Sequence, residues 1–576
     1  MPLMKRKFYS MLFGGTLTMI VVSVLVMSDS LIAGIFIGQE AVAGITLATP
    51  IYNLSVFLGS VFSLGVPIVY SAEMGKFSRK EADRVFGLSL LMSLVIGAVL
   101  FVVISWFGES FLNAFHPLPD VLEQAREFLF WMRFTMLLLP LNQLLSSMVY
   151  ADGDEKISAI ANIVQGAGNI GASVLLGMQM GVRGISLAGF LFTAISLGVM
   201  FLHFMKKSNS LRLNLYFSFS LLKRVFRYSL IDASSYLFMA VFTAAMNYFV
   251  TSQFGAEYLI LVSAVALCRE FQMVFDGIGE AFTPIISVYL AEECSAGIRF
   301  IYKLSEKTAV LEGIVVAGIL ILIAPLIPDI LDISDPEMIR FTVSGIRILA
   351  FGSPFVSLLY LIPSYDLLID RILPGLEVSA VRDILIPVPL AVLLGILFGP
   401  NGFFAGLMAA SFAAWIVTVV VQRLRYRDDA PLFLGKIEKE KESLLYDLTV
   451  EPYSIQRVRD EIGEALEAHS YDHSTVFRVM LLFEELFMLF HDKNEGREIR
   501  GECALILEGK MIRMITRDTG VVFNPTDDDM AITSLGTHVL LCMADQVSDR
   551  RNHLVTMSFN RTVFEIRALK QETQAG

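Results

Sequence analysis

One carboxylate lies in an apolar stretch where it could exchange a proton or bind a cation. In the stretch Ser23–Pro50, SVLVMSDSLIAGIFIGQEAVAGITLATP, Asp29 stands late in an apolar helix that is followed by a short Gly-rich turn and a second apolar run. An ionised side chain inside hydrocarbon costs several kcal/mol, so intramembrane acids are rare and are functional candidates by default. The alternative is that Asp29 lies near a helix end and reaches interfacial water.

A second set of polar residues follows helical spacing in another apolar segment. The spacing i, i+3, i+7 and i+11 predicts one continuous polar face on a helix. Charged groups at membrane depth are expected to face a cleft or a bundle interior rather than lipid. These residues are therefore candidates for binding a cationic substrate or a second proton, and the alternative is an internal ion pair between Arg269 and Asp276. The set is Arg269, Gln272, Asp276 and Glu280.

The composition indicates that membrane-spanning helices position these side chains. Of the 576 residues, 55% are hydrophobic and only 18% are charged, unlike a soluble protein. Apolar runs of about 20 residues, enough to cross a hydrocarbon layer of ~30 Å, recur along the chain. We predict an all-α polytopic membrane protein with twelve transmembrane helices, followed by a small α/β domain. The helices are expected near residues 11–36, 43–70, 85–108, 122–149, 157–178, 184–205, 221–250, 257–290, 304–328, 338–365, 378–398 and 402–423.

The loops alternate in basic content. Lys and Arg gather in every second loop, while the intervening loops carry almost none, which is the positive-inside pattern. An even number of spans with both termini in the cytoplasm satisfies every loop. We therefore expect a protein integral to the plasma (inner) membrane with both termini cytoplasmic.

The two halves of the membrane part repeat each other. Shifts of about 214 to 218 residues superpose glycines, prolines and charged residues of the first half on like residues of the second. The repeat predicts a six-helix lobe over 1–215 and a second over 216–428, in the same orientation, which together frame a central cleft for alternating access. The matched pairs are Gly38 and Gly255, Glu40 and Glu257, Pro67 and Pro284, Arg133 and Arg347, Pro140 and Pro354, Gly181 and Gly399, and Gly184 and Gly402.

Three segments resemble multidrug and toxic compound extrusion (MATE) transporters. They are MSDSLIAGIFIGQEAVAGITLATP, SLGVPIVYSAEMGKFSRKEADRVFG and PLNQLLSSMVYADGDEKISAIANIVQGAGNIGASVLLG, and the resemblance spans roughly residues 8–425. It implies that Asp29 is the cation-coupling carboxylate, for H⁺ or Na⁺, and that polar residues of the fifth helix face it. Met239 stands where many members carry a Glu in the seventh helix, so coupling is expected to rest on the N-terminal half.

The fifth-helix residues that match the family are three amides at positions i, i+3 and i+7. On one helical face they would surround the Asp29 carboxylate in a cavity of low dielectric, where desolvation disfavours its charged form. The alternative is that they form interhelical hydrogen bonds that hold the bundle together. The three are Asn162, Gln165 and Asn169.

The tail differs from the rest of the chain. From Lys436 onward it holds 17 of the 45 basic and 25 of the 56 acidic residues, so most of the net charge of −11 lies there. We predict a connector over 429–449 and an α/β domain over 450–576. Helices are expected at 455–469 and 474–490 and strands at 502–508, 511–518, 554–559 and 563–567.

The tail resembles the ATP-binding domain of anti-sigma-factor and histidine kinases in a degenerate form. The resemblance is carried by FEELFMLFHDKN, TRDTGVVFNP and SLGTHVLLCMADQV. It implies a nucleotide site at Glu485, Asp518 and Gly520. Leu489 replaces the Asn that holds Mg²⁺ in the family, Val522 replaces a turn glycine, and of the later Gly-rich turn only Gly536 remains. A regulatory or oligomerisation module without a ligand is the favoured interpretation, with a protein partner for the tail. The alternative is nucleotide sensing without hydrolysis, in which Asp518 accepts the adenine amino group.

Together these features predict a secondary active exporter of small, cationic organic compounds, coupled to H⁺ or Na⁺, with a regulatory tail. The alternatives are a flippase for lipid-linked intermediates, which would need a basic cleft, and a membrane receptor whose tail binds a partner. We expect no enzymatic activity, no cofactor and no nucleic acid partner. The four cysteines, Cys268, Cys294, Cys503 and Cys542, are scattered without metal-ligand spacing, so no metal site is expected.

Overall fold

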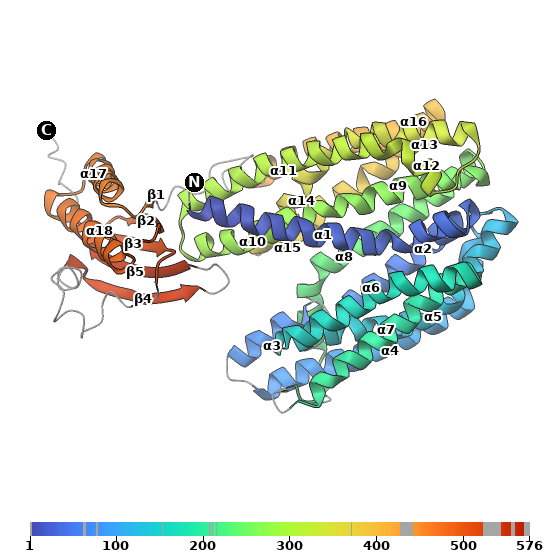
Figure 1. Cartoon of the computed structure of the whole chain (residues 1–576), viewed down its shortest axis with the longest axis horizontal. Helices are drawn as coiled ribbons and strands as arrows, with labels where there is room; N and C mark the ends of the chain where they lie inside the picture. Colours follow the sequence, from blue (N-terminus) through green and yellow to red (C-terminus); the bar gives the residue numbers. More distant parts are fainter. Residues whose placement is uncertain are drawn as a thin grey trace. The chain divides into compact units, whose positions relative to one another are not determined.

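The computed structural model of the chain describes residues 3–61, 65–75, 79–152, 154–206, 209, 211–214, 216–369, 371–426, 442–521, 523, 543–554 and 559–569. Helices make up nearly all of the described chain up to residue 426, and an antiparallel sheet with two helices follows (Figure 1). The part up to residue 426 is hereafter the helical part, and the rest is the C-terminal domain.

Seven helices form the first half of the helical part. They are α1 (Leu3–Phe36), α2 (Gln39–Ser60), α3 (Val66–Gly75), α4 (Arg79–Asn113), α5 (Pro119–Ala151), α6 (Glu155–Met180) and α7 (Val182–Phe204). The second half begins with α8 (Phe219–Gln253) and continues through η1 (Ala256–Tyr258), α9 (Leu259–Phe271), η2 (Gln272–Phe275), α10 (Asp276–Ala291) and α11 (Ser295–Ile323). It ends with η3 (Ala324–Leu326), α12 (Ile327–Ile330), α13 (Pro336–Ala350), α14 (Ser353–Leu368), α15 (Ile372–Ala380), η4 (Val381–Leu385) and α16 (Pro387–Tyr426).

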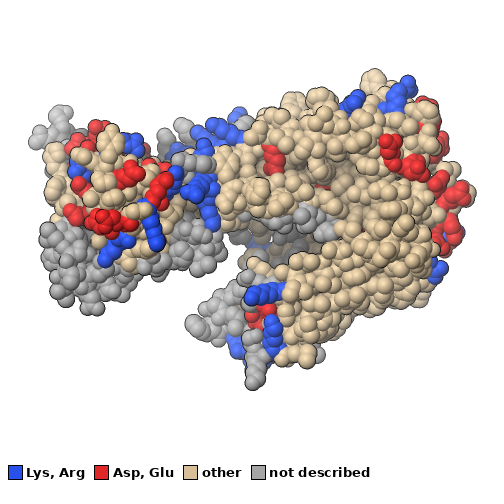
Figure 2. Space-filling model, in the orientation of Figure 1, with Lys and Arg blue, Asp and Glu red and all other residues tan. Residues whose placement is uncertain are grey.

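Among the described residues, nine helices are long and apolar enough to cross a membrane. The count becomes ten when α13 and α14, which meet at an angle of 51°, are taken as one span. This is fewer than the twelve that we predicted, partly because the predicted spans 378–398 and 402–423 fall within one apolar helical segment, Ile372–Tyr426, most of which is α16. The boundary between the two predicted spans is marked by a break at Gly399, whose φ of 68° and ψ of −155° are not helical. Figure 2 shows that the visible surface between the ends of these helices is largely uncharged.

Two pairs of glycines that the predicted repeat superposes have similar backbone angles. Gly38 and Gly255 both precede a helix and have φ values of 136° and 121°. Gly181 and Gly399 have φ values of 63° and 68°. A side chain disfavours such positive φ angles, so glycine is needed at each equivalent turn. Paired turns with the same conformation support two repeats of one architecture.

The chain separates into two compact units. One comprises Met1–Thr16, Asp276–Thr308 and Val419–Gly576, and the other comprises Leu17–Phe275 and Ala309–Thr418. The first unit therefore joins the C-terminal domain to the start of α1, to α10 and to the first half of α11. The second unit contains most of the helical part, with a core built from Ala, Val, Leu, Ile and Phe side chains of both repeats.

The C-terminal domain is a five-stranded antiparallel sheet in the order β1-β2-β3-β5-β4. Its strands are β1 (Glu442–Thr449), β2 (Arg500–Glu508), β3 (Met511–Asp518), β4 (Gln546–Leu554) and β5 (Phe559–Arg567). The helices α17 (Pro452–Ala468) and α18 (His473–Lys493) contribute Ile462, Phe483 and Phe487 to a core shared with Leu505, Met514 and Phe564 of the sheet.

Three differences from the predicted domain concern its strands. The stretch 442–449, predicted as connector, forms β1 and pairs with β2 along its whole length. The strand β4 was not predicted. Most of the strand predicted at 554–559 lies outside the described residues, as does the connector over 427–441.

Candidate functional site

The first candidate, Asp29, faces α6. Asn169 and Ser173, one turn apart on that helix, are within hydrogen-bonding reach of its carboxylate. Ser173 also donates to Oδ1 of Asn169 at 3.3 Å, so the two α6 side chains are bonded to each other. The Oδ1 atom of Asp29 is buried and has no hydrogen-bond partner among the described residues. A buried carboxylate oxygen without a donor is suited to take up a proton or a cation.

A second carboxylate, which the sequence analysis did not select, belongs to the same site. Glu270 of α9 lies close enough to Asp29 for their charges to interact. Tyr52 of α2 lies within electrostatic range of both acids and of Tyr236 on α8. The site therefore draws on the first repeat through α1, α2 and α6 and on the second through α8 and α9.

The other two amides of the predicted set form contacts between helices. Asn162 accepts a hydrogen bond from Ser146 of α5 at 3.1 Å. Gln165 donates to the hydroxyl of Thr193 on α7 at 3.3 Å. Asn169 is thus the member of the set that reaches Asp29, while the contacts of Asn162 and Gln165 fit the alternative role in holding helices together.

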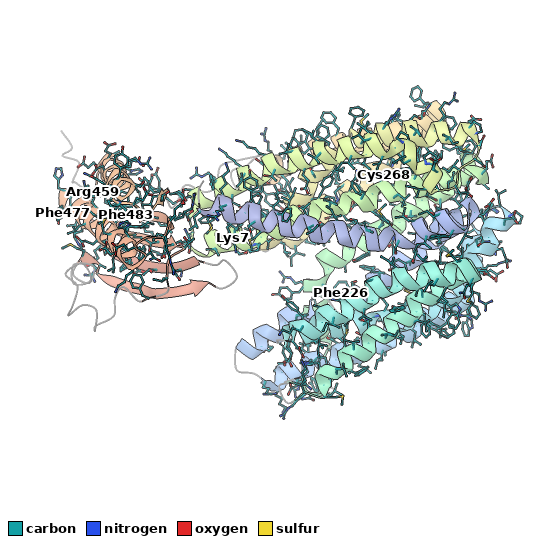
Figure 3. The ribbon with its side chains drawn as sticks, viewed as in Figure 1. Lys7, Phe226, Cys268, Arg459, Phe477 and Phe483 are labelled. Atoms are coloured by element: carbon teal, nitrogen blue, oxygen red, sulfur yellow. The ribbon has the colours of Figure 1, made fainter. Side chains whose placement is uncertain are left out.

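Arg269 is held by a carboxylate far away in the sequence. Its Nη2 atom lies 3.0 Å from Oδ1 of Asp383 in η4, and its guanidinium stacks 3.9 Å above the ring of Phe242. Arg382 also binds Asp383, at 2.8 Å, and stacks on Tyr360. The short π-helix η4 thus provides the carboxylate between two arginines, and the ion pair considered for Arg269 and Asp276 is replaced by one with Asp383. Cys268, which precedes Arg269, is labelled on α9 in Figure 3.

The predicted polar face does not run along one continuous α-helix. The α-helical turns stop at Phe271, and η2 separates Arg269 on α9 from Asp276 on α10. Gln272 donates to Ser353 at 3.5 Å, and Asp276 is exposed at the start of α10. The side chain of Glu280 lies outside the described residues. The 3₁₀ segment therefore interrupts the predicted face, and Glu270, which precedes it in α9, is the acid whose charge interacts with that of Asp29.

The site is built from oxygen donors. It offers two carboxylates, two tyrosine hydroxyls, the Asn169 amide and the Ser173 hydroxyl. Such groups exchange protons or hold small hard cations. Among the residues that the structure describes, no group of three or more His, Cys, Asp or Glu side chains is arranged to hold a metal ion.

The predicted nucleotide site in the C-terminal domain is largely occupied by its own side chains. Leu489, at the position expected for a Mg²⁺-binding amide, is 9% exposed and packs in the domain core. Asp518 accepts hydrogen bonds from the N–H of Gly520 at 2.9 Å and from Asn560 at 3.0 Å. Burial, together with Glu484, raises the pKa of Glu485. Val522 and Gly536 lie outside the described residues.

Comparisons with known proteins show what the fold resembles. Several solved structures of membrane transporters match 70% or more of this chain. An inward-facing multidrug resistance MATE family transporter of the MOP superfamily matches with a TM-score of 0.65 at 18% identity, over 70% of this chain and 94% of that chain. An outward-facing structure of such a transporter matches with a TM-score of 0.59 at 18% identity, over 73% and 96%.

A third match is a MOP superfamily transporter from Pyrococcus furiosus, described by a reversed polarity of its binding pocket. Its TM-score is 0.60 at 18% identity, over 73% of this chain and 96% of that chain. Residues 16–170 match the MatE family model. No curated protein matches the chain significantly. The chain thus carries a MatE domain over residues 16–170 and has the fold of MATE transporters, which confirms the resemblance of the helical part. The resemblance of the tail to an ATP-binding domain stays a prediction.

Proposed function

We propose that the chain is a secondary active exporter of small organic cations, driven by H⁺ or Na⁺ through alternating access. The observation that carries this proposal is the pair Asp29 and Glu270, which brings one carboxylate from each repeat to a single site. A site shared between two repeats changes its surroundings when the repeats move against each other. Loading and release of a cation can therefore be linked to the direction in which the site opens.

The charge of the site supports a cationic cargo. Arg269, the base nearest to Glu270 in the sequence, is engaged by Asp383 and by the ring of Phe242. The two carboxylates are therefore not neutralised by this arginine. A flippase for lipid-linked pyrophosphates would need the opposite polarity, with basic groups free to bind phosphate.

The alternation of basic loops supports a protein integral to the plasma (inner) membrane. It also supports an orientation in which both termini lie in the cytoplasm. In this orientation the C-terminal domain is a cytoplasmic module. Its packed core and the Leu489 substitution favour a regulatory role through protein contacts over nucleotide hydrolysis, because the group that would hold Mg²⁺ is missing.

The test is transport of the cationic dye ethidium into inside-out vesicles that contain the full chain. A pH gradient or a Na⁺ gradient is imposed separately, and dye accumulation is followed by fluorescence. We expect one gradient to drive uptake, and Asp29→Asn to abolish it while the protein still inserts. Asp120→Asn, at an exposed position in the first turn of α5, is the matched control. Undiminished uptake by Asp29→Asn would contradict the role given to this carboxylate.

A further inference from the structure

Four charged residues form a row across the sheet of the C-terminal domain. Asp447, Glu502, Arg517 and Arg561 are directly opposite one another on β1, β2, β3 and β5. Side chains alternate between the faces of a strand, and the neighbours Leu448 and Cys503 belong to the core shared with α17 and α18. The four residues, hereafter the charged row, therefore lie on the other face of the sheet.

The centre of the charged row binds the end of α10. Glu292, in the turn between α10 and α11, contacts Arg517, and it accepts a hydrogen bond from Nε of Arg561 at 2.6 Å. Arg517 also binds Glu502, whose carboxylate accepts a hydrogen bond of 2.8 Å from the hydroxyl of Tyr289 in α10. The side chains of Arg517, Glu502 and Glu292 are 0%, 1% and 2% exposed. This is a buried, charge-balanced network and not a surface ion pair.

The β1 edge binds the starts of two further helices. The backbone N–H of Leu3, at the first turn of α1, donates to Oδ1 of Asp447 at 2.5 Å. Ser443 of β1 accepts a hydrogen bond from the N–H of Ala296 at 2.7 Å and shares another, at 2.9 Å, with the hydroxyl of Ser295. The same sheet thus holds the start of α1, the end of α10 and the start of α11.

Two of these segments lead directly to the carboxylates of the candidate site. Asp29 lies 26 residues after Leu3 on α1, or about 39 Å along a helix that rises 1.5 Å per residue. Glu270 lies on α9, which continues through η2 into α10 and ends at the turn that carries Glu292. Each carboxylate is therefore joined by helical chain to a group fixed on the charged row.

We propose that the charged row couples the C-terminal domain to the cation site. Arg517 is the positioning residue that fixes the end of α10, and Asp447 of the same row holds the start of α1. The inference rests on the proposed function, because it takes Asp29 and Glu270 as the groups that change charge during transport. A buried ionic network holds its partners in a defined arrangement, since loss of one partner leaves an uncompensated charge. With such a coupling, linkage requires that a change of charge at the cation site alters the stability of contacts along the charged row.

The experiment measures hydrogen–deuterium exchange of the full-length protein in detergent. Wild type is compared with the double variant Asp29→Asn/Glu270→Gln, which mimics the protonated site. We expect exchange in peptides covering 289–298 and 500–518 to change at least threefold. When the same two substitutions are added to Arg517→Met, the exchange of these peptides should equal that of Arg517→Met alone. Identical exchange of wild type and the double variant would overturn the proposal.

Two further variants separate coupling from simple folding effects. Arg517→Lys keeps the charge in case Arg517→Met unfolds the domain, and it should retain a reduced response. Arg459→Met removes a half-buried arginine of α17 that pairs with Asp460 and Glu484, outside the charged row (Figure 3), and should retain the full response. The exchange readout needs no substrate. A chain that moves no ethidium but shows the response would refute the proposed function alone, and ethidium transport without the response would refute the coupling alone.

Discussion

Thr46 and Ser263 share a hydrogen bond of 2.7 Å between their hydroxyl oxygens, although 217 residues separate them. The separation equals the offset that relates Gly38 to Gly255 and Pro67 to Pro284 in the sequence. Equivalent residues of two repeats can touch each other only on the axis that relates the repeats. The helices α2 and α9 therefore meet on this axis, and Asn247 of α8 adds a bond of 3.2 Å to the backbone oxygen of Thr46.

A cysteine pair at these positions should lock the two repeats together. Because the hydroxyl oxygens are 2.7 Å apart, oxidation of Thr46→Cys/Ser263→Cys is expected to form a disulfide. Ethidium uptake should stop on oxidation and return on reduction, since the repeats can no longer separate at this point. Each single cysteine variant is the control. Unchanged transport by a fully cross-linked sample would show that α2 and α9 stay together throughout the cycle.

Asp29 and Glu270 should behave as one site. Neutralising either acid removes a charge that interacts with the other acid. We therefore expect non-additive effects of Asp29→Asn and Glu270→Gln, measured as changes in the cation concentration needed for half-maximal transport. We expect a coupling free energy of about 1 kcal/mol or more from the double-mutant cycle, which corresponds to roughly fivefold or more in affinity. Strict additivity would place the two carboxylates in separate sites.

The carboxylate between two arginines should be important for stability. Asp383→Asn leaves Arg269 and Arg382 without their shared partner, and such a loss from a buried pair costs about 3–5 kcal/mol. We expect a clear drop in the unfolding temperature of the purified protein. Arg457→Ala, which breaks an ion pair whose side chains are 53% and 46% exposed, should change the stability by less than about 1 kcal/mol. Equal losses in the two variants would argue against a buried network around Asp383.

Acid should weaken the junction of α5, α6 and α7. Hydrogen bonds from Lys206 and His203 hold the pKa of Asp154 below its ordinary value of 3.8. A depressed pKa means that the unfolded state takes up the proton first, so this stabilisation is present above pH 3.8 and is lost as the pH falls below it. Thermal unfolding of wild type should lose stability more steeply below this pH than that of Asp154→Asn. Parallel curves would show that Asp154 contributes nothing.

The full chain should not bind MgATP. Leu489 fills the metal-ligand position with a side chain packed in the core, and Asp518 already accepts hydrogen bonds from Gly520 and Asn560. Calorimetric titration with MgATP at millimolar concentration should therefore give no saturable heat. Titration with ADP without Mg²⁺ tests the adenine contact separately. Saturable binding in either titration would restore a nucleotide-sensing role for the domain.

The sequence was sufficient to predict what depends on local pattern. The apolar runs, the paired glycines and the strand at Met511–Asp518 follow from periodicity and turn chemistry, and each is found near its expected bounds. Asp29 could be selected because a charge in an apolar run is conspicuous. The strand β4 was missed because its sequence, QVSDRRNHL, is polar and lies at the edge of the sheet, where no apolar alternation is required.

Glu270 was passed over because the polar residues were chosen by helical face. A continuous α-helix places Arg269, Gln272 and Asp276 on one face and leaves Glu270 off it, and the approach of Glu270 to Asp29 is a contact between α9 and α1. The partner of Arg269 was equally hidden, because Asp383 lies 114 residues away in a π-helical turn that periodicity does not indicate. Both contacts join segments far apart in the chain, which the spacing of residues within one helix does not reveal.

The bond between Leu3 and Asp447 also has a consequence for the biogenesis of the protein. Its two partners are 444 residues apart, and α1 leaves the ribosome well before β1. At about 5–20 residues per second, the strand that receives the start of α1 is made roughly 20–90 s later. During that interval α1 lacks the partner of its first turn. The synthesis of the C-terminal domain therefore completes the contacts of a helix made much earlier.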